Sequence, residues 1–177
     1  VALLHYHHST SDASQEIKML RQDFYTRLMA DLLKRNLQGA LQLATNAPDD
    51  VLRTARTIQQ LKNIPALPDT PPPLFQYFDQ LFERKVTGAD GAQHPGKLNP
   101  LESVELARLV LSQGKGQLLQ QWLADSRLEA SEELGDLLRQ LQTPDTYKLA
   151  LKIYQEIKSA FSKEAKSISF VSKQRSP

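Results

Sequence analysis

Residues 99–141 read NPLESVELARLVLSQGKGQLLQQWLADSRLEASEELGDLLRQL. The stretch opens with Asn99, Pro100 and Glu102, which supply a cap, a first-turn proline and an acidic residue in the third helical position. These features favour the start of a helix, because the first amides of a helix have no partners within it. We therefore predict a helix from this point to about Ser112.

Two more helices are predicted directly after it. Gly114 and Gly116 break the first helix, leucines at helical spacing predict a second over 117–124, and Ser131 is placed to cap a third over 132–141. Connections this short force neighbouring helices to be antiparallel. Helices of this length are marginal alone and must pack against one another.

The same pattern extends in both directions from this stretch. Apolar residues three or four positions apart predict an early helix from Asp12 to about Lys34, with Asp12 and Gln15 at capping-box spacing. Further helices are predicted over 37–46, 48–61, 74–85 and 144–158.

Two segments interrupt the helices. Residues 65–73 contain five prolines, which forbid helix and impose an extended path, and we expect a packed strap between helical pairs. Residues 86–99 contain three glycines and few large apolar side chains, so they predict a loop in which His94 is solvated.

The fold class follows from these elements. No segment alternates apolar and polar residues as a strand does, and no hairpin turn of the Asn-Gly kind occurs. The sequence predicts an all-α fold, an α-solenoid or zigzag of short antiparallel helix pairs. A compact bundle is the alternative, since no clean internal repeat separates the two.

Composition excludes several classes of protein. The 22 Lys and Arg nearly balance 20 Asp and Glu, so no nucleic-acid partner is expected. With no cysteine the chain fits a reducing compartment such as the cytosol. Its apolar runs fall far short of the roughly 20 residues that span a bilayer, so no membrane insertion is expected. Residues 1–10 lack a secretory signal and are interpreted as the cut edge of a longer protein.

Residues with chemical potential are few. His5, His7 and His8 form the only cluster of metal-ligand character, but no acidic partner lies nearby. The segment 114–116, Gly-Lys-Gly, lacks the strand and the Ser or Thr of a phosphate loop, so a turn is expected. We expect no catalytic, cofactor-binding or metal site, and no enzyme.

Other candidates also have structural interpretations. The acidic pairs at 49–50 and 132–133 lie at predicted helix starts, where they complement the helix dipole. Trp122 is either an exposed partner anchor or a core wedge, and its flanking leucines favour the core. The tail is weakly basic, which suits a membrane or acidic partner less well than a frayed end; its cations are Lys163, Lys166, Lys173 and Arg175.

Several short motifs, read in order, resemble the clathrin heavy chain just beyond its N-terminal propeller. The most specific is LEASEELGDL at 128–137, because helix periodicity does not dictate its order of small, acidic and apolar residues. The other landmarks are NAP at 46–48, LRT at 52–54, TI at 57–58, Pro65, QYF at 76–78, ES-x-EL at 102–106 and QLL-x-x-WL at 117–123.

The resemblance covers residues 24–160. Residues 1–23, expected to be a helical extension, and residues 161–177, expected to be a frayed C-terminal segment, match poorly. The loop at 86–99 is longer than the turn of the family, and Ala130 stands where the family has cysteine.

The resemblance implies a structural role. A right-handed zigzag of helices would link the propeller to the leg of a three-legged coat protein, in the cytoplasm at the cytosolic face of coated pits and vesicles, during endocytosis and intracellular vesicle traffic. Its partners would be the rest of the heavy chain, neighbouring coat legs and helical adaptor peptides. The alternative is a clathrin-linker-like module of another protein that binds an amphipathic partner helix.

No cofactor is implied. The residues expected to carry the packing are apolar and lie on the predicted helix faces: Phe24, Leu28, Leu52, Ile58, Tyr77, Phe78, Leu119, Trp122, Leu123, Leu134, Leu137 and Tyr154.

Overall fold

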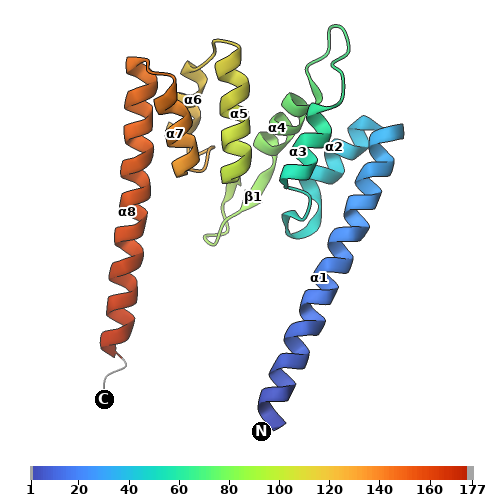
Figure 1. Ribbon diagram of the computed structural model, residues 1–177, viewed down its shortest axis with the longest axis vertical. Helices are drawn as coiled ribbons and strands as arrows, with labels where there is room; N and C mark the ends of the chain where they lie inside the picture. The colour runs from blue at the N-terminus through green and yellow to red at the C-terminus, as the bar shows by residue number, and fades with distance from the viewer. Residues whose placement is uncertain (1, 175–177) are drawn as a thin grey trace. The chain divides into compact units, whose positions relative to one another are not determined.

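The computed structural model describes the backbone of residues 2–174 and the side chains of residues 13–167. Eight α-helices and one short hairpin make up this described part, so the all-α prediction is confirmed (Figure 1). The chain divides into two compact units, residues 1–81 and 82–177.

The first unit begins with a long helix and continues with short ones. Helix α1 packs against α2, and the core is built on Met29, Leu41, Leu61 and Tyr77, each no more than 1% exposed. Its elements are α1 (Ala2–Arg35), α2 (Leu37–Asn46), the 3-10 turn η1 (Pro48–Asp50), α3 (Ala55–Lys62) and most of α4 (Pro73–Glu83).

The second unit begins at the end of α4. Helix α5 packs against α6 and α7, and α7 packs against α8. In the second unit, each of these helices thus packs on a helix one or two places away along the chain, which fits an α-solenoid. The elements are β1 (Lys85–Thr87), β2 (Gln93–Pro95), α5 (Pro100–Ser112), α6 (Gln117–Ala124), α7 (Glu132–Gln140) and α8 (Pro144–Gln174).

The helix starts that carry clear caps lie where the sequence predicts them. Asn99 Oδ1 accepts the Glu102 amide at 2.8 Å, and Glu102 Oε2 accepts the Asn99 amide at 2.9 Å, which completes a capping box. Ser131 caps α7 by accepting the Leu134 amide at 3.2 Å. Asn36 starts α2 rather than merely ending α1, and accepts the Gly39 amide.

The start of α1 differs from the prediction. The helix begins at Ala2, so Asp12 lies inside it and is no cap. Phe24, predicted to pack, is 60% exposed, and Leu20 is 65% exposed. The spacing rule was correct about helix but wrong about burial, because the N-terminal part of α1 extends beyond α2 within this unit (Figure 1).

The prediction of a helix from Pro48 is wrong. Pro48 starts only a 3-10 turn, since Asp49 and Asp50 adopt φ of 54° and 52°, in the left-handed region that a helix cannot contain. Helix α3 starts anew at Ala55, after Thr54 accepts the Thr57 amide at 3.4 Å.

The proline segment is exposed, not packed. Every residue from Pro65 to Pro72 is exposed, and Leu67 is 67% exposed. The segment makes one backbone turn, in which the Thr70 amide donates to the Leu67 carbonyl at 3.3 Å. Prolines lack the amide that would tie an extended chain to a neighbour.

The loop predicted at 86–99 contains a small hairpin. Strands β1 and β2 pair antiparallel with Val86 opposite His94, and Gly88 donates to the Ala92 carbonyl at 2.9 Å. Asp90 supplies the turn chemistry by accepting the Ala92 amide at 3.0 Å. His94 is exposed, as predicted, but lies on a strand.

Helix α8 differs from the prediction in phase and in length. The spacing of apolar residues predicts a buried stripe through Tyr147 and Leu151, but these residues are 51% and 45% exposed. The buried face carries Leu149, Ala150 and Ile153 instead. The helix continues to Gln174, where the sequence predicted a frayed segment.

Candidate functional site

The second unit contains a joint centred on Arg127, shared by four segments. The Arg127 guanidinium donates to the Phe82 carbonyl at 2.8 Å and lies 5.2 Å from the centroid of the Phe82 ring. A cation at the end of α4 is favourable, because carbonyls at a helix C-terminus carry partial negative charge. The Arg127 carbonyl accepts the Leu98 amide at 2.9 Å. We call Phe82, Leu98, Trp122 and Arg127 the Arg127 joint.

Trp122 belongs to this joint. Its ring lies 5.4 Å from that of Phe82, and its carbonyl accepts the Arg127 amide at 2.8 Å. The side chain is half-buried among residues of its own chain. This placement favours the core interpretation over an exposed anchor.

Ser103 connects a second set of segments. Its hydroxyl donates to the Leu98 carbonyl at 3.5 Å and accepts the Glu129 amide at 2.9 Å, and the residue is fully buried. The two bonds fix the strand-like chain before α5 and the chain between α6 and α7 to one helix.

Helices α7 and α8 meet closely at Gly135. A Cβ on Gly135 would lie 2.7 Å from the Tyr154 ring, so glycine is needed for this approach. The Tyr154 hydroxyl donates to Asp136 at 2.5 Å, and this bond to a carboxylate raises the pKa of Tyr154.

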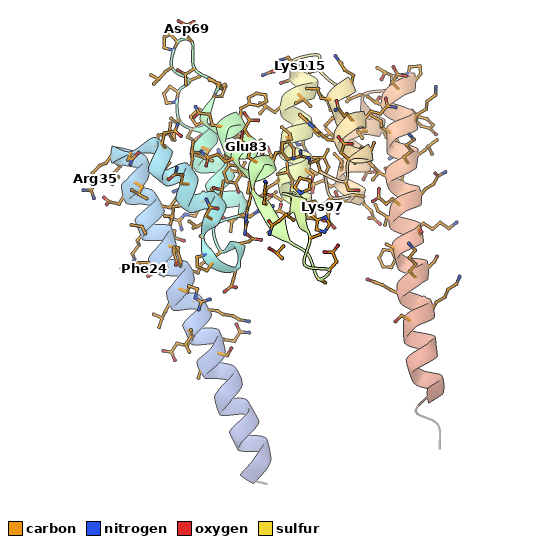
Figure 2. The ribbon with its side chains drawn as sticks, turned by 180° about the vertical axis from the view of Figure 1, so that it is seen from behind. Phe24, Arg35, Asp69, Glu83, Lys97 and Lys115 are labelled. Atoms are coloured by element: carbon orange, nitrogen blue, oxygen red, sulfur yellow. The ribbon has the colours of Figure 1, made fainter. Side chains whose placement is uncertain are left out.

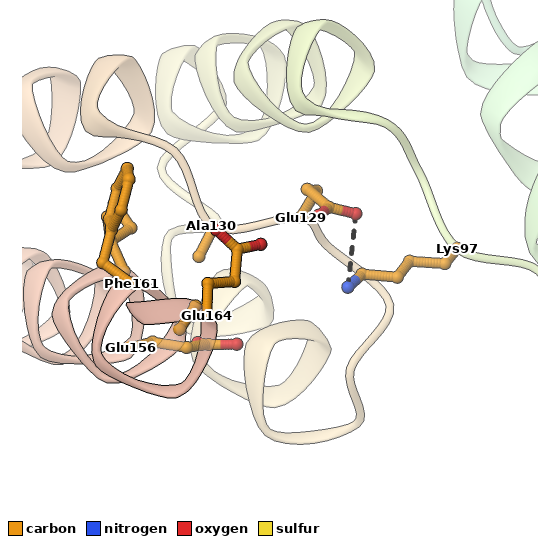
Figure 3. Close-up of a pocket in the computed structure, with 8 residues that line it drawn as sticks. Lys97, Glu129, Ala130, Glu156, Phe161 and Glu164 are labelled. Atoms are coloured by element: carbon orange, nitrogen blue, oxygen red, sulfur yellow. Dashed lines mark ion pairs between the residues drawn. The ribbon is translucent and has the colours of Figure 1, made fainter. Parts of the chain in front are cut away.

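A groove lies between α8 and the chain around Glu129, shown in Figure 3. It measures about 220 Å³ and contains one ion pair, Lys97 to Glu129 at 3.3 Å, opposite Glu156 and Glu164 of α8. Phe161 at its edge is 66% exposed. The groove therefore offers apolar surface and an excess of carboxylates. Its lining residues are Lys97, Glu129, Ala130, Glu156, Ile157, Ala160, Phe161 and Glu164.

The remaining predicted motifs have structural surroundings. Gly114 has φ of 71°, its amide donates to Leu111, and Lys115 donates to the Val110 carbonyl, which is the helix-ending turn that glycine favours. Asp49 pairs with Arg21, and Asp50 pairs with Arg53 at 3.3 Å. Asp49 and Asp50 therefore form ion pairs with arginines, rather than lying at the start of an α-helix as predicted.

The second acidic pair and the basic tail lie on the surface. Glu132 and Glu133 are exposed in the first turn of α7, where Glu133 lies 3.9 Å from Arg108. Lys163 and Lys166 are exposed on α8. The side chains of His5, His7, His8, Lys173 and Arg175 lie outside the described residues. Among side chains 13–167, no three His, Cys, Asp or Glu residues gather as metal ligands would.

The structure divides the residues predicted to pack into three groups. Six are buried: Leu52, Ile58, Tyr77, Phe78, Leu119 and Leu134. Five are half-buried: Leu28, Trp122, Leu123, Leu137 and Tyr154. Phe24 is exposed. Sequence reasoning missed Ser103, Arg127 and Gly135. Nothing in the sequence marks Ser103 or Arg127 as a packing residue, whereas a glycine inside a predicted helix, such as Gly135, is a signal of close packing that could have been used.

These features define a structural class: an all-α segment whose short helices are joined by buried packing contacts. No helix in the described part of the chain is both long and apolar enough to cross a membrane.

Comparison with known proteins finds similarity to clathrin heavy chains. Residues 19–81 match the Clathrin-H-link family. The chain is 44% identical over 115 residues to the clathrin heavy chain of Dictyostelium discoideum and, over the same length, to clathrin heavy chain 2 of Homo sapiens, covering 65% of this chain and 6% of each relative. It is 37% identical over 131 residues to the probable clathrin heavy chain of Schizosaccharomyces pombe, covering 74% of this chain and 7% of that protein.

Residues 19–81 of this chain thus match a clathrin heavy-chain linker region, and 65% of the chain is similar to clathrin heavy chains. It spans only about 6% of the length of the relatives it matches.

Proposed function

We propose that this chain serves as a stiff helical connector in a clathrin coat, between an N-terminal propeller and the leg. One observation carries the proposal: 44% identity over 115 residues to clathrin heavy chains, together with the linker-family match at 19–81. Its place would be the cytosolic face of coated pits and vesicles, in endocytosis and intracellular vesicle traffic.

The packing supports a mechanical role. The Arg127 joint and the two bonds of Ser103 tie loops to helices at positions where a flexible connector would have solvated chain. A stack in which each helix contacts its neighbours transmits bending gradually along its length. Such a role needs no catalytic group, and we propose none.

The proposed repeat occupies residues 24–160, with residues 1–23 as an N-terminal helical extension and 161–177 as a C-terminal segment. The proposed partners are the rest of the heavy chain and neighbouring coat legs. Nucleic acid and direct membrane insertion have no part in this role.

The groove at α8 supports a further partner, a helical adaptor peptide. The residues that line it include three carboxylates, Glu129, Glu156 and Glu164, and one cation, Lys97. Phe161 adds exposed apolar area. An amphipathic helix with basic residues on its flanks complements this surface in both charge and polarity.

A clathrin-linker-like module in an unrelated protein is the other candidate. The comparisons do not favour it, because the relatives reported above are themselves clathrin heavy chains.

The test is a replacement in cells. A Dictyostelium clathrin heavy chain whose matching 115-residue region is exchanged for that of this chain is expressed in cells that lack their own heavy chain. We expect it to enter coated pits and restore coat-dependent uptake. A chimera that is folded and abundant but stays out of coats would contradict the proposal.

A further inference from the structure

The proline segment between α3 and α4 exposes apolar side chains on the surface of the first unit. Figure 2 shows Asp69 at the tip of a loop that projects from the helices. All side chains from Pro65 to Pro72 are exposed, and Leu67 is 67% exposed. Proline pre-sets an extended backbone, so this loop holds its shape without a partner strand.

The sequence around this loop has a defined order. Residues 62–68 read KNIPALP: a cation, two residues, a proline, two residues and a second proline. An apolar residue, Ile64 or Leu67, precedes each of these prolines. Segments with Pro-x-x-Pro spacing bind aromatic-lined grooves, because one face of the extended helix presents both prolines.

Two overlapping pairs of prolines have Pro-x-x-Pro spacing, Pro65 with Pro68 and Pro68 with Pro71, and the backbone conformation distinguishes them. Pro65, Ala66 and Leu67 lie in no helix and carry no turn assignment, whereas Pro68 and Asp69 are the central residues of the turn in which the Thr70 amide donates to the Leu67 carbonyl. Asp69 has φ of 57°, which breaks an extended helix at that point. The match at Pro68 and Pro71 encloses this left-handed residue and the match at Pro65 and Pro68 does not, so the structure favours the first pair.

We propose that residues 62–68 are a docking segment for a proline-recognition domain of the SH3 type. The pairs Ile64-Pro65 and Leu67-Pro68 would occupy the two aromatic-lined slots of the groove. Pro65, Leu67 and Pro68 are exposed, and Ile64 is half-buried, so the Ile64 side chain would have to turn outward on binding.

Charge sets the direction of docking. Lys62, the exposed last residue of α3, lies at the N-terminal end of the segment, and exposed Asp69 follows its other end. A groove with acidic residues beside one end would therefore bind the segment in one orientation, with Lys62 over those acids. The docking proposal does not depend on the proposed role as a coat connector. Either proposal can be disproved while the other stands.

The experiment titrates the purified full chain into isotope-labelled SH3 domains chosen because their peptide ligands have the form cation-x-apolar-Pro-x-apolar-Pro. We expect saturable shifts of the groove aromatic residues in at least one such domain. Leu67→Ala and Pro68→Ala should each weaken binding by roughly tenfold, because each removes a buried apolar contact.

Two matched controls accompany these variants. Pro72→Ala alters a proline of the same loop outside the segment, and should leave the affinity within about twofold. Lys62→Glu should weaken binding most at low salt, whereas Lys115→Glu, at an exposed cation of the other unit, should not. Circular dichroism should be unchanged in all five, since the altered side chains are exposed.

The proposal is overturned if no domain of the set binds. It is also overturned if Leu67→Ala binds as the unaltered chain does, or if Pro72→Ala weakens binding as much as Pro68→Ala. Binding to a WW domain but to no SH3 domain would replace it with a different partner class.

Discussion

At the scale of single residues, Ser103 carries the most specific buried polar contact in the second unit. Ser103→Ala should lower the free energy of unfolding by about 1–3 kcal/mol, because the Glu129 amide loses its partner inside the protein. Denaturant titration measures the change. Ser112→Ala is the matched control, since the Ser112 hydroxyl is exposed and bonds only within its own helix, to the Leu109 carbonyl. Equal effects of both substitutions would refute the role given to Ser103.

Gly135 reverses an ordinary rule. Alanine inside a helix is usually more stable than glycine by about 0.5–1 kcal/mol. Here the added Cβ meets the Tyr154 ring at 2.7 Å, so Gly135→Ala should be destabilising instead. Combining it with Tyr154→Leu, which removes the ring, should make the same alanine neutral or stabilising. A purely additive double mutant would show that the ring contact is not the cause.

Single residues also mark where sequence reasoning stops. The caps at Asn99 and Ser131 were predictable because a cap is a local contact within a few residues. The exposure of Phe24 was not, because periodicity shows which face is apolar but not whether another element covers it. Arg127 was missed since its partners, Phe82 and Leu98, are distant in sequence.

At the scale of elements, the backbone conformation just after a helix determines which residue is most stable there. Ser126, two residues after the end of α6, has φ of 55°. Its amide donates to the Leu123 carbonyl, and the Arg127 amide donates to the Trp122 carbonyl. Glycine adopts this conformation without the cost that a Cβ brings. Ser126→Gly should raise the free energy of unfolding by about 1 kcal/mol.

The control for that prediction is Ala124→Gly, at the exposed last residue of the same helix. It should destabilise by about 0.5–1 kcal/mol, because glycine costs more entropy in a helix. Thermal unfolding of both variants gives the comparison. Destabilisation by Ser126→Gly would contradict the helix-end geometry.

The hairpin should respond to acid. The bond from the Ala92 amide and then the contact with His94 hold the pKa of Asp90 below its ordinary value of 3.8. The charged carboxylate is thus favoured in the folded hairpin, and this stabilisation is present above 3.8 and is lost as pH falls through the lowered pKa. Protection of the Gly88 amide, measured by NMR, should decrease over that acidic range.

Asp90→Asn tests the cause. Its side-chain carbonyl still accepts the Ala92 amide but carries no titrating charge, so protection of Gly88 should become independent of pH over the same range. A pH dependence that persists in this variant would assign the effect to another group.

Elements were easier to predict by type than by extent. The second helix and the one at 117–124 were predicted with the observed bounds, because glycine, proline and capping residues stand at their ends. The left-handed Asp49 and Asp50 were not predicted, since no glycine marks that turn. The hairpin at 85–95 was missed although Asp90-Gly91 is a dipeptide that hairpin turns favour, because its flanking strands are short and show no sustained alternation of apolar and polar residues.

At the scale of the whole molecule, the family resemblance seen in short motifs agrees with the linker-family match at 19–81 and with the clathrin relatives. The fold class was predictable because short helices with short turns have few arrangements. The docking segment at 62–68 depended on the structure, because only the exposure of the proline loop separates a ligand from the packed strap that the sequence predicted.

The central claim is that these helices form a stiff connector of the clathrin type. Electron cryomicroscopy of coats built from the Dictyostelium heavy chain that carries this region tests it most directly. We expect the propeller at the position and orientation that it has in coats of the unaltered heavy chain. Intact chimeric legs whose propellers give only smeared density, or occupy a new position, would contradict the account.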